Sequence, residues 1–425
     1  MELQPGSIPI VHEMPQQLEI QRFIVSSSGD AGDVLVERLG VSDGTKTPPL
    51  ETFSTVSAFH SIASTCRDIV PGWKHAVGTR DLTSAIEIKE MVEGLSNQLF
   101  RVTLKTSEES VGGAGFKTVL YRIYGEHVSS FYNPEHELKV FKTLSAIGIG
   151  PKMVAHGPGW RIEEFHEDSA PLLVRSLQNP STFTQIASIL GRLHKVHHHA
   201  KFPNSEFDVS TAIAFQRIED WVLEGQVALG RLAHSEALRE RLRIDEVLPL
   251  VEKMRSLLVL ASENPQVMGN KIVFCHSDAQ ENNILVTPYG LRLIDFEYAD
   301  FNFQFADIGN VFNEFTMDYL WPEAPYFKGT PSDYPSSAAR RMFASVYLSE
   351  YLDAPVLDYP NAGGIQIDQL LEGAEVGSQL SHLLWGFWSL VRAQQQGEGG
   401  TSFDFVSYAQ FRFDQFLTKK TVLGW

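Results

Sequence analysis

Two acidic residues and one amide residue are spaced along the chain in a way that could support transfer of a phosphoryl group. Asp278 and Asn283 lie close together in sequence, and two apolar runs that flank the turn 287–290 separate Asn283 from Asp295. A hairpin of this kind brings Asn283 and Asp295 together at its open end. Carboxylate and amide oxygens at such a place form a site suited to Mg²⁺. Asp278 precedes the hairpin and is free to face an incoming hydroxyl group.

These residues divide the chemistry between them. Phosphoryl transfer needs a metal ion to neutralise the phosphate oxygens and a carboxylate to align the hydroxyl group and accept its proton. We therefore predict that Asp278 is the base, Asp295 the principal metal ligand and Asn283 the second ligand. Gln280 is expected to support the phosphate or substrate end of the site. Together with His276, Asp278 and Asn283 fit H-x-D-x-x-x-x-N, the form of a kinase catalytic loop.

Composition limits the partners and the class of protein. The chain has 425 residues, which suggests two folded units, and its 43% hydrophobic and 20% charged residues are ordinary for a globular protein. A formal net charge of -17 disfavours nucleic acid and anionic lipid as partners. No apolar run approaches the roughly 20 residues of a membrane span, so we expect no stable membrane insertion.

The sequence also bears on the cellular compartment and on the oligomeric state. The two cysteines cannot form a disulfide framework, and residues 1–10 lack the features of a signal peptide, so a reducing, cytoplasmic location is expected. The sequence leaves the oligomeric state open, a homodimer included.

The elements expected along the chain predict a two-lobed organisation. Residues 1–70 contain loop-forming runs and are interpreted as an extension that is flexible or loosely docked. Residues 71–167 are predicted to form a small β-rich lobe that also holds a helix between Asn133 and Gly148. Its strands are expected at 86–91, 98–104, 118–124, 152–155 and 160–165.

Residues 168–425 are predicted to form a larger, mainly helical lobe. Its main helical stretches are expected at 211–230, 245–262, 338–351, 366–393 and 403–416. This order of elements predicts an α+β, protein-kinase-like two-lobed fold.

Three segments resemble the choline and ethanolamine kinase family: residues 274–285, 293–303 and 306–315. A weaker resemblance runs from about residue 86 to the end of the chain. The chain departs from the family at Ser277, where asparagine is usual, and at Phe315, where choline kinases tend to carry tryptophan. The resemblance implies ATP and Mg²⁺ as cosubstrates and phosphocholine or phosphoethanolamine as product. It thereby implies the first step of phospholipid synthesis through CDP-choline or CDP-ethanolamine.

The resemblance also implies a nucleotide site. Its phosphate-covering turn matches Gly94, Leu95, Ser96 and Asn97, although by itself this segment reads as an ordinary hairpin turn. Glycine permits close backbone approach, and the serine and asparagine can donate to phosphate oxygens.

Four further residues are predicted around the nucleotide, together with Gln280 and Asp295. Arg122 lies where a kinase places its β3 lysine and can clamp phosphate. Glu137 is the candidate ion-pair partner of Arg122. Glu164 and Phe165 lie where the chain crosses between lobes, so their backbone is expected near adenine.

On the alcohol side, the resemblance points to an aromatic cage with an acidic residue. Trp385 and Trp388 share one face of a helix, which the residues alone would assign to helix core. Tyr408, Tyr319 and Glu314 match the family's aromatic and acidic positions. A quaternary ammonium group is held well by aromatic faces near a carboxylate.

Two residues are interpreted as structural support for the catalytic loop. Asp307 is expected to brace the catalytic loop through hydrogen bonds, and His276 to support it.

Choline is the primary predicted substrate, with ethanolamine also accepted. Residues 317–319 and those that follow are similar to choline kinases, whereas residues 313–315 favour ethanolamine kinases. The alternatives are an ethanolamine-specific kinase, an aminoglycoside- or homoserine-type phosphotransferase and a non-catalytic scaffold.

Overall fold

The computed structural model describes residues 55–91, 97–106, 115–124, 133–358, 363–396 and 403–424. The chain divides into two compact units. The first comprises residues up to 127 together with 153–165, and the second comprises 128–152 together with 166–425. The predicted phosphate-covering residues Gly94, Leu95 and Ser96 lie outside the described residues, as do residues 1–54 of the predicted extension.

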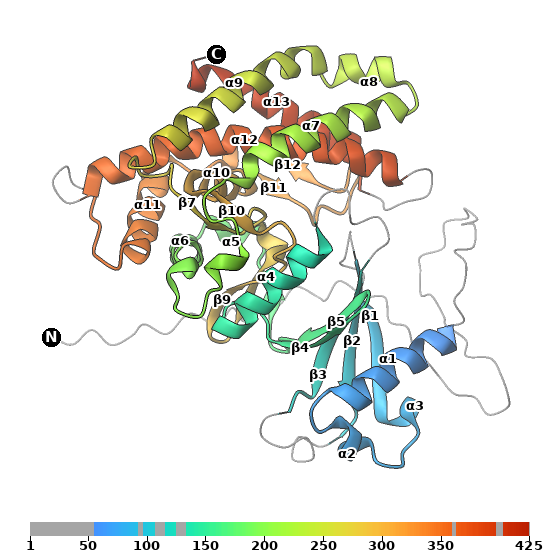
Figure 1. The fold of residues 1–425 in the computed structure, drawn as a ribbon. Helices are drawn as coiled ribbons and strands as arrows, with labels where there is room; N and C mark the ends of the chain where they lie inside the picture. The colour runs from blue at the N-terminus through green and yellow to red at the C-terminus, as the bar shows by residue number, and fades with distance from the viewer. Residues whose placement is uncertain are drawn as a thin grey trace. The chain divides into compact units, whose positions relative to one another are not determined.

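The first unit is an antiparallel sheet packed against short helices (Figure 1). The strand order is β1-β2-β3-β5-β4, with β1 (Ile86–Met91), β2 (Asn97–Leu104), β3 (Thr118–Tyr124), β5 (Trp160–Glu164) and β4 (Met153–Gly157). Three helices precede it: α1 (Thr55–Ile69), α2 (Trp73–Val77) and α3 (Leu82–Ala85). The five strands expected from the sequence are confirmed, with ends that differ by at most two residues.

Helix α1 corrects the boundary of the predicted extension. It lies within residues 1–70, yet Ile62, Ala63 and Cys66 on one face are buried in the core of the first unit. Their spacing of one helical turn was overlooked because loop-forming runs dominate the preceding 50 residues. A second difference concerns α4 (Pro134–Ile147), which was expected in the small lobe and belongs to the second unit.

The ends of α4 illustrate how local sequence sets an element. The Asn133 side chain accepts hydrogen bonds from the backbone of Glu135 (2.9 Å) and His136 (3.3 Å) and so caps the first turn. Gly148 ends the helix at φ 81°, a left-handed conformation that glycine adopts without steric cost. The predicted start and stop are therefore both confirmed.

The rest of the second unit is mainly helical. Its helices are α5 (Val174–Leu177), α6 (Pro180–His194), α7 (Ile213–Arg231), α8 (Ser235–Arg241), α9 (Ile244–Glu263), α10 (Gln304–Glu314), α11 (Ser337–Tyr351), α12 (Ile365–Gln396) and α13 (Phe405–Lys419). Short 3₁₀ helices lie at Val196–His198, Asn204–Glu206, Glu281–Asn283, Pro331–Asp333 and Lys420–Leu423. The five main helical stretches predicted from the sequence are confirmed.

Short antiparallel strands in the second unit surround the predicted catalytic segment. They are β6 (Ala170–Pro171), β7 (Ile272–Cys275), β8 (Ile284–Thr287), β9 (Gly290–Leu293), β10 (Asp300–Phe303), β11 (Met317–Asp318) and β12 (Lys328–Gly329). They form the sheets β6-β8-β9, β10-β7 and β11-β12. The hairpin β8–β9, paired from Ile284 with Leu293 to Thr287 with Gly290, is the one that the sequence predicts.

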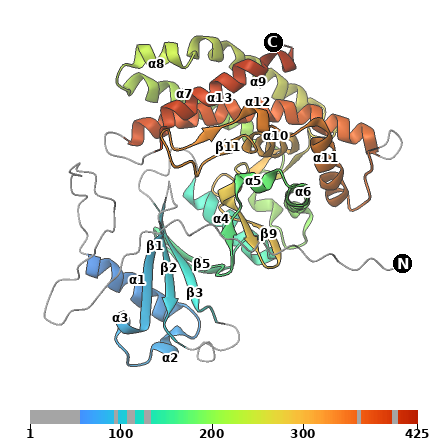
Figure 2. The same ribbon diagram turned by 180° about the vertical axis from the view of Figure 1, so that it is seen from behind.

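Helix α12 organises the second unit and packs beside α7, α10 and α13 (Figures 1 and 2). Two glycines allow α10 and α12 to approach at backbone distance. A Cβ atom at Gly309 would lie 2.2 Å from Ser378 N, and one at Gly377 would lie 2.1 Å from Phe305 O. The predicted site residues on these two helices are therefore held in a fixed relation to each other.

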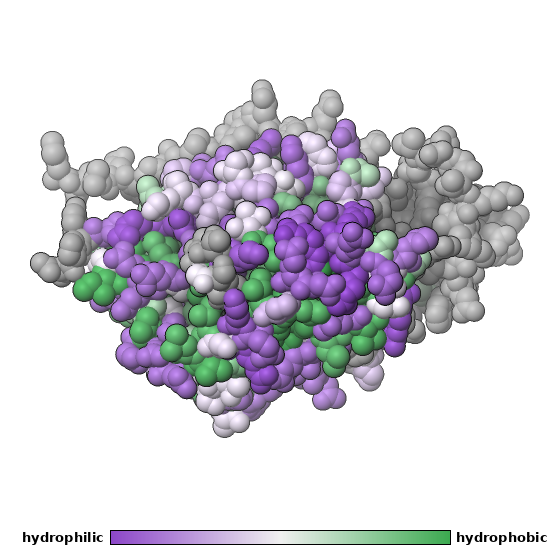
Figure 3. All heavy atoms as spheres, turned by 90° about the horizontal axis from the view of Figure 1, so that it is seen from above, coloured by the Kyte–Doolittle hydropathy of each residue, from purple (hydrophilic) through white to green (hydrophobic). Residues whose placement is uncertain are grey.

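The surface of the second unit mixes charged and apolar side chains. Figure 3 shows one face on which hydrophobic side chains are interspersed among hydrophilic ones. Helices α7 and α9 contribute exposed apolar residues, of which Leu223 and Leu260 are the most exposed. Within the described residues, no helix is long and apolar enough to cross a membrane.

Candidate active site

The segment predicted to be catalytic forms a loop between β7 and β8. Strand β10 pairs with β7, with Asp300 opposite Cys275, so the chain before β10 returns to the start of the loop. Ser277 (φ 68°) and Asp295 (φ 60°) adopt left-handed backbone conformations, which are uncommon for residues with a side chain. Strain of this kind persists only where surrounding contacts hold the backbone in place.

Asn283 and Asp278 are joined directly. The Asn283 amide nitrogen donates to the Asp278 backbone oxygen (2.9 Å) and to its carboxylate Oδ2 (2.8 Å). Because Nδ2 is occupied in this way, Oδ1 is the atom of Asn283 that remains for a metal ion. The Ile294 backbone donates to Asn283 O (3.0 Å), which places the residue before Asp295 next to Asn283 at the open end of the hairpin.

Asp307 on α10 holds the start of the loop. Its Oδ2 accepts from the backbone nitrogen of His276 (2.6 Å), and its Oδ1 accepts from that of Ser277 (2.6 Å). His194 on α6 also contacts Oδ2 through Nε2 (3.1 Å). Burial acts to raise the pKa of Asp307, but the hydrogen bond and charge of His194 and the hydrogen bond from the His276 backbone outweigh it, and the pKa is lowered. This geometry supports the interpretation of Asp307 as a brace.

His276 links the catalytic loop to the β8–β9 hairpin through hydrogen bonds, so its role is structural. Its Nε2 lies 2.9 Å from Ile294 O, and its Nδ1 accepts from the Asp278 backbone nitrogen at 3.3 Å. This pattern requires the neutral ring with hydrogen on Nε2. Burial, the main cause, lowers the pKa of His276, which favours the same neutral form.

Asp278 lies in a strongly negative environment. Burial, followed by the negative charge of Glu314, raises the pKa of the Asp278 carboxyl well above its usual value. Glu297 and Asp295 add to this effect, and Arg412 opposes it. Such an excess of carboxylates is the environment that a divalent cation would relieve.

Gln280 shapes the turn that follows the proposed base. Its backbone nitrogen donates to Asp278 O (2.9 Å), and its side-chain Oε1 accepts from Asn282 N (3.0 Å), which caps the 3₁₀ helix Glu281–Asn283. The amide oxygen is therefore engaged in the loop itself.

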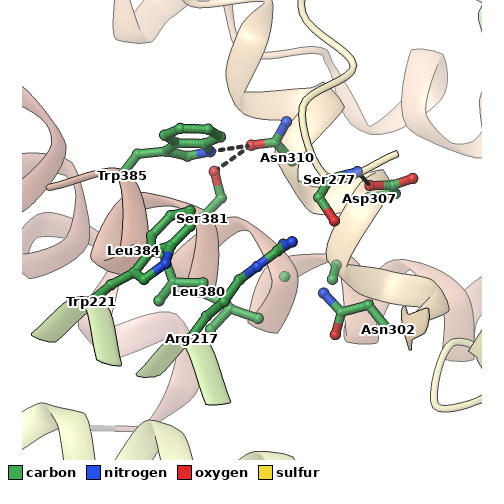
Figure 4. A pocket seen from close by; sticks show the side chains of 12 residues that line it. Arg217, Trp221, Ser277, Asn302, Asp307, Asn310, Leu380, Ser381, Leu384 and Trp385 are labelled. Carbon is green, nitrogen blue, oxygen red and sulfur yellow. Dashed lines mark hydrogen bonds between the residues drawn. The ribbon is translucent and has the colours of Figure 1, made fainter. Parts of the chain in front are cut away.

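Trp385 and Trp388 on α12 form one aromatic cluster. Their ring centroids are 5.2 Å apart and nearly perpendicular, and each residue keeps 8% of its surface exposed. Trp385 Nε1 donates to Asn310 Oδ1 (3.1 Å), as Figure 4 shows. Trp388 Nε1 donates to the hydroxyl of Tyr298 (3.0 Å), which also stacks edge-on against Trp385. Tyr298 was not among the residues predicted from the sequence, although it directly follows Glu297 in a segment that resembles the family.

The other three predicted substrate residues are tied together by Arg412 on α13, which sequence reasoning also missed. Arg412 donates to Glu314 Oε1 (2.7 Å) and to the hydroxyls of Tyr319 (3.0 Å) and Tyr408 (2.6 Å). Tyr319 donates in turn to Glu314 Oε2 (2.8 Å). Arg412 and Tyr408 lie one helical turn apart, so an arginine on the apolar face of a predicted helix was the available signal.

This network changes the interpretation of Glu314. Arg412 is fully buried, and Glu314 is 2% exposed. Because the Arg412 guanidinium pairs with the Glu314 carboxylate at close range, it offsets part of the negative charge that Glu314 adds to the site. Glu314 also orients Tyr319 and, through Arg412, Tyr408.

Glu281 is a third residue that sequence reasoning missed, after Tyr298 and Arg412. It is 1% exposed, and its Oε1 accepts from the Tyr319 backbone nitrogen (3.3 Å). Burial and the nearby charge of Glu314 raise the pKa of Glu281 to about 8. No local sequence signal marks Glu281, because its burial and its contact with Tyr319 depend on the tertiary structure.

The predicted nucleotide residues that the structure describes lie mostly in the first unit. Arg122 on β3 contacts Glu163 (3.4 Å), and Arg161 contacts the same carboxylate (3.2 Å). Asn97 is buried at the start of β2, and Glu164 ends β5.

The remaining nucleotide-side residues are Phe165 and Glu137. Arg101 lies over the Phe165 ring at 4.9 Å. Glu137 is buried on α4, in the other unit from Arg122. The proposed pairing of Arg122 with Glu137 therefore stays a prediction.

The chain is similar to known proteins of one family. Residues 88–417 match the family model described as choline/ethanolamine kinase. The choline/ethanolamine kinase of Mus musculus is 30% identical over 361 residues, which cover 84% of each chain. Choline kinase alpha of Mus musculus is 31% identical over 389 residues, covering 84% of this chain and 80% of that one. The solved choline kinase of Cryptosporidium parvum Iowa II is similar with a TM-score of 0.73 and 34% identity, over 86% and 96% of the two chains.

Proposed function

The chain belongs to the choline/ethanolamine kinase family, and from this premise we propose that it transfers the terminal phosphoryl group of ATP to the hydroxyl group of choline and of ethanolamine. One observation carries the proposal. A half-buried carboxylate, Asp278, is oriented by the Asn283 amide and lies among further carboxylates, and its charge acts on Tyr298, which contacts both Trp385 and Trp388. The Asp278 carboxylate suits the hydroxyl group of an alcohol substrate, and the aromatic cluster suits its cationic head group.

In this mechanism, Asp278 accepts a hydrogen bond from the substrate hydroxyl and takes its proton as the oxygen attacks phosphorus. Asn283 keeps Asp278 in place through two hydrogen bonds, one to its backbone oxygen and one to its carboxylate. The bond from phosphorus to the leaving oxygen of ADP breaks as the new bond forms. Asp307 and His276 do not react but hold the loop in its left-handed conformation.

The acidic residues around Asp278 fit a Mg²⁺ ion. We propose Asp295 and Asn283 Oδ1 as its ligands from the protein, because their positions follow from the hairpin. Mg²⁺ bound there would neutralise the phosphate oxygens of ATP and lower the pKa of Asp278. The proposed ATP contacts are Gln280 and, in the first unit, Arg122, Asn97, Glu164 and Phe165.

The aromatic cluster supports choline as the preferred substrate. Trp385, Trp388 and Tyr298 offer ring surfaces, and the Trp388 nitrogen already donates to Tyr298. A trimethylammonium group needs aromatic faces and no hydrogen-bond acceptors, whereas the ammonium group of ethanolamine loses its water partners in such a cluster. The expected order is therefore choline before ethanolamine. A cytoplasmic location is part of this proposal and is supported by two buried, unpaired thiols.

The direct test is an assay of purified protein with ATP, Mg²⁺ and each alcohol. We expect ADP and phosphocholine, with a lower kcat/KM for ethanolamine. Trp388→Phe is expected to raise the KM for choline more than the KM for ATP, because only the alcohol contacts the ring. Trp160→Phe, whose ring stacks on Tyr121 in the first unit, is the matched control. Failure to phosphorylate either alcohol would refute the proposal.

A further inference from the structure

Glu281 joins the catalytic loop to the segment that carries Tyr319. It begins the 3₁₀ helix Glu281–Asn283, whose last residue donates through its side-chain amide to the Asp278 carboxylate (2.8 Å). The Asn283 backbone nitrogen also donates to Gln280 O (3.0 Å). From this compact turn, Glu281 Oε1 accepts a hydrogen bond from the Tyr319 backbone nitrogen (3.3 Å), 38 residues further along the chain. One turn of the chain therefore holds both the proposed base and the backbone of Tyr319.

The other end of Tyr319 is held from a different direction. Its hydroxyl donates to Glu314 Oε2 on α10 (2.8 Å), accepts from Arg412 on α13 (3.0 Å) and lies 2.8 Å from the hydroxyl of Tyr408. Tyr319 thus connects the catalytic loop, which binds its backbone, to two helices, which bind its hydroxyl. If the contact with the catalytic loop were lost, the backbone of Tyr319 could move while its hydroxyl stayed bound. Its ring would then turn relative to the proposed base.

Glu281 is poorly satisfied at the place where it is buried. Only 1% of its surface is exposed, and its Oε2 has no hydrogen-bond partner among the described residues. Burial and the negative charge of Glu314 disfavour its ionised form, whereas a protonated Oε2 would be a buried donor without an acceptor among those residues. Conflicts of this kind with folding stability are expected at functional sites. The presence of Glu281 therefore points to the reaction rather than to the fold.

We propose that Glu281 is a positioning residue that fixes the span between Asp278 and Tyr319 and thereby selects amino alcohols with two carbon atoms between the hydroxyl and the cationic group. The inference rests on the proposed function, in which Asp278 meets the hydroxyl group and aromatic residues meet the cation. A substrate that contacts both at once must match this span in length. With the span fixed, one added methylene group displaces the hydroxyl group, and a displacement of about 1 Å can cost roughly 10²-fold in rate.

The experiment compares choline with its three-carbon homologue, 3-(trimethylammonio)propan-1-ol. Both alcohols carry the same head group, so they differ only in the span that they require. The wild type is expected to favour choline by about 10²-fold in kcat/KM. Glu281→Met keeps the size of the side chain and removes both carboxyl oxygens, so this preference should fall about tenfold while the KM for ATP stays within about twofold. An unchanged preference in Glu281→Met would overturn the proposal.

Glu281→Gln separates the hydrogen bond from the charge. The side-chain oxygen of glutamine can accept from the Tyr319 backbone nitrogen in the same place, so the preference for choline should stay close to that of the wild type. A loss as large as that of Glu281→Met would show that the bond to Tyr319 does not set the span, and the proposal would be wrong. Glu219→Met, at an exposed position on α7 paired with Arg255 (3.0 Å), is the matched control and should behave like the wild type.

Two further measurements separate positioning from folding. A purely structural role would lower the melting temperature of Glu281→Met and reduce kcat/KM for both alcohols by the same factor, which would contradict the proposal. A crystal structure of the wild type with choline does not depend on any variant, and it should show Glu281 Oε1 within hydrogen-bond reach of Tyr319 N. A wider separation would reject the inference.

The wild type distinguishes this inference from the proposed function. If it phosphorylates choline and the preference does not change in Glu281→Met, the role of Glu281 is refuted and the proposed function stands. If it phosphorylates neither alcohol, the proposed function is refuted, and the role of Glu281 is refuted with it.

Discussion

Arg412 is the residue whose replacement best tests how the substrate side is built. Arg412→Met keeps most of the side-chain volume and removes the charge together with its donated hydrogen bonds to Glu314, Tyr319 and Tyr408. The Glu314 carboxylate, 2% exposed, then stays buried without its partner. Removing one member of a buried pair costs about 3–5 kcal/mol of folding stability. The loss is large against a typical total of about 5–15 kcal/mol.

A double-mutant cycle makes this expectation specific. Glu314→Gln alone leaves the arginine charge unpaired and should also destabilise. The double variant carries neither charge, so its loss should be smaller than the sum of the two single losses, by about 1–3 kcal/mol. Arg412→Lys keeps the charge but has fewer donors in a different geometry, and it should fall between the wild type and Arg412→Met.

Two measurements are needed. Urea unfolding gives the folding stability, at a temperature low enough for the single variants to remain folded without urea. Steady-state kinetics give the KM for choline. Tyr319 and Tyr408 lose their common donor in Arg412→Met, so the KM for choline should rise more than the KM for ATP. Arg243→Met, which breaks an exposed pair with Glu246 (2.7 Å), is the control and should change little. Additive losses in the cycle would show that Arg412 and Glu314 do not act as a pair.

Three further outcomes are expected. Asp278→Asn should lower kcat by about 10²–10⁴-fold with unchanged circular dichroism, and wild-type kcat in this variant would exclude Asp278 as the base. Because the pKa of Glu281 is raised to about 8 from 4.5, its contribution to stability is present at low pH and is lost as the pH rises to about 8. Glu281→Gln should therefore make the melting temperature depend less on pH between pH 5 and 8. An unchanged dependence on pH would show that Glu281 is not its cause. Gly377→Ala should destabilise strongly in thermal unfolding, since its Cβ would lie 2.1 Å from Phe305 O, and a neutral result would mean that α10 and α12 can separate freely.

The elements that the sequence predicted well are those whose signals are local. Asn133 and Gly148 mark the ends of α4 because capping and left-handed conformations depend on adjacent residues. The hairpin β8–β9 follows from two apolar runs around a turn, and so does the meeting of Asn283 with the residue before Asp295. Helix α1 was missed because its buried face becomes apparent only against the sheet that it covers.

By itself, the sequence determined the hairpin of the predicted catalytic segment, the fold class and the family, since each of these depends on residue types at short spacings. Tertiary structure alone decided which charges are matched. Arg412 lies far along the chain from Glu314, and only the packing of α10 and α13 against α12 makes them a pair. Electrostatic energy depends on distance and burial in space, and neither can be read from the order of the residues.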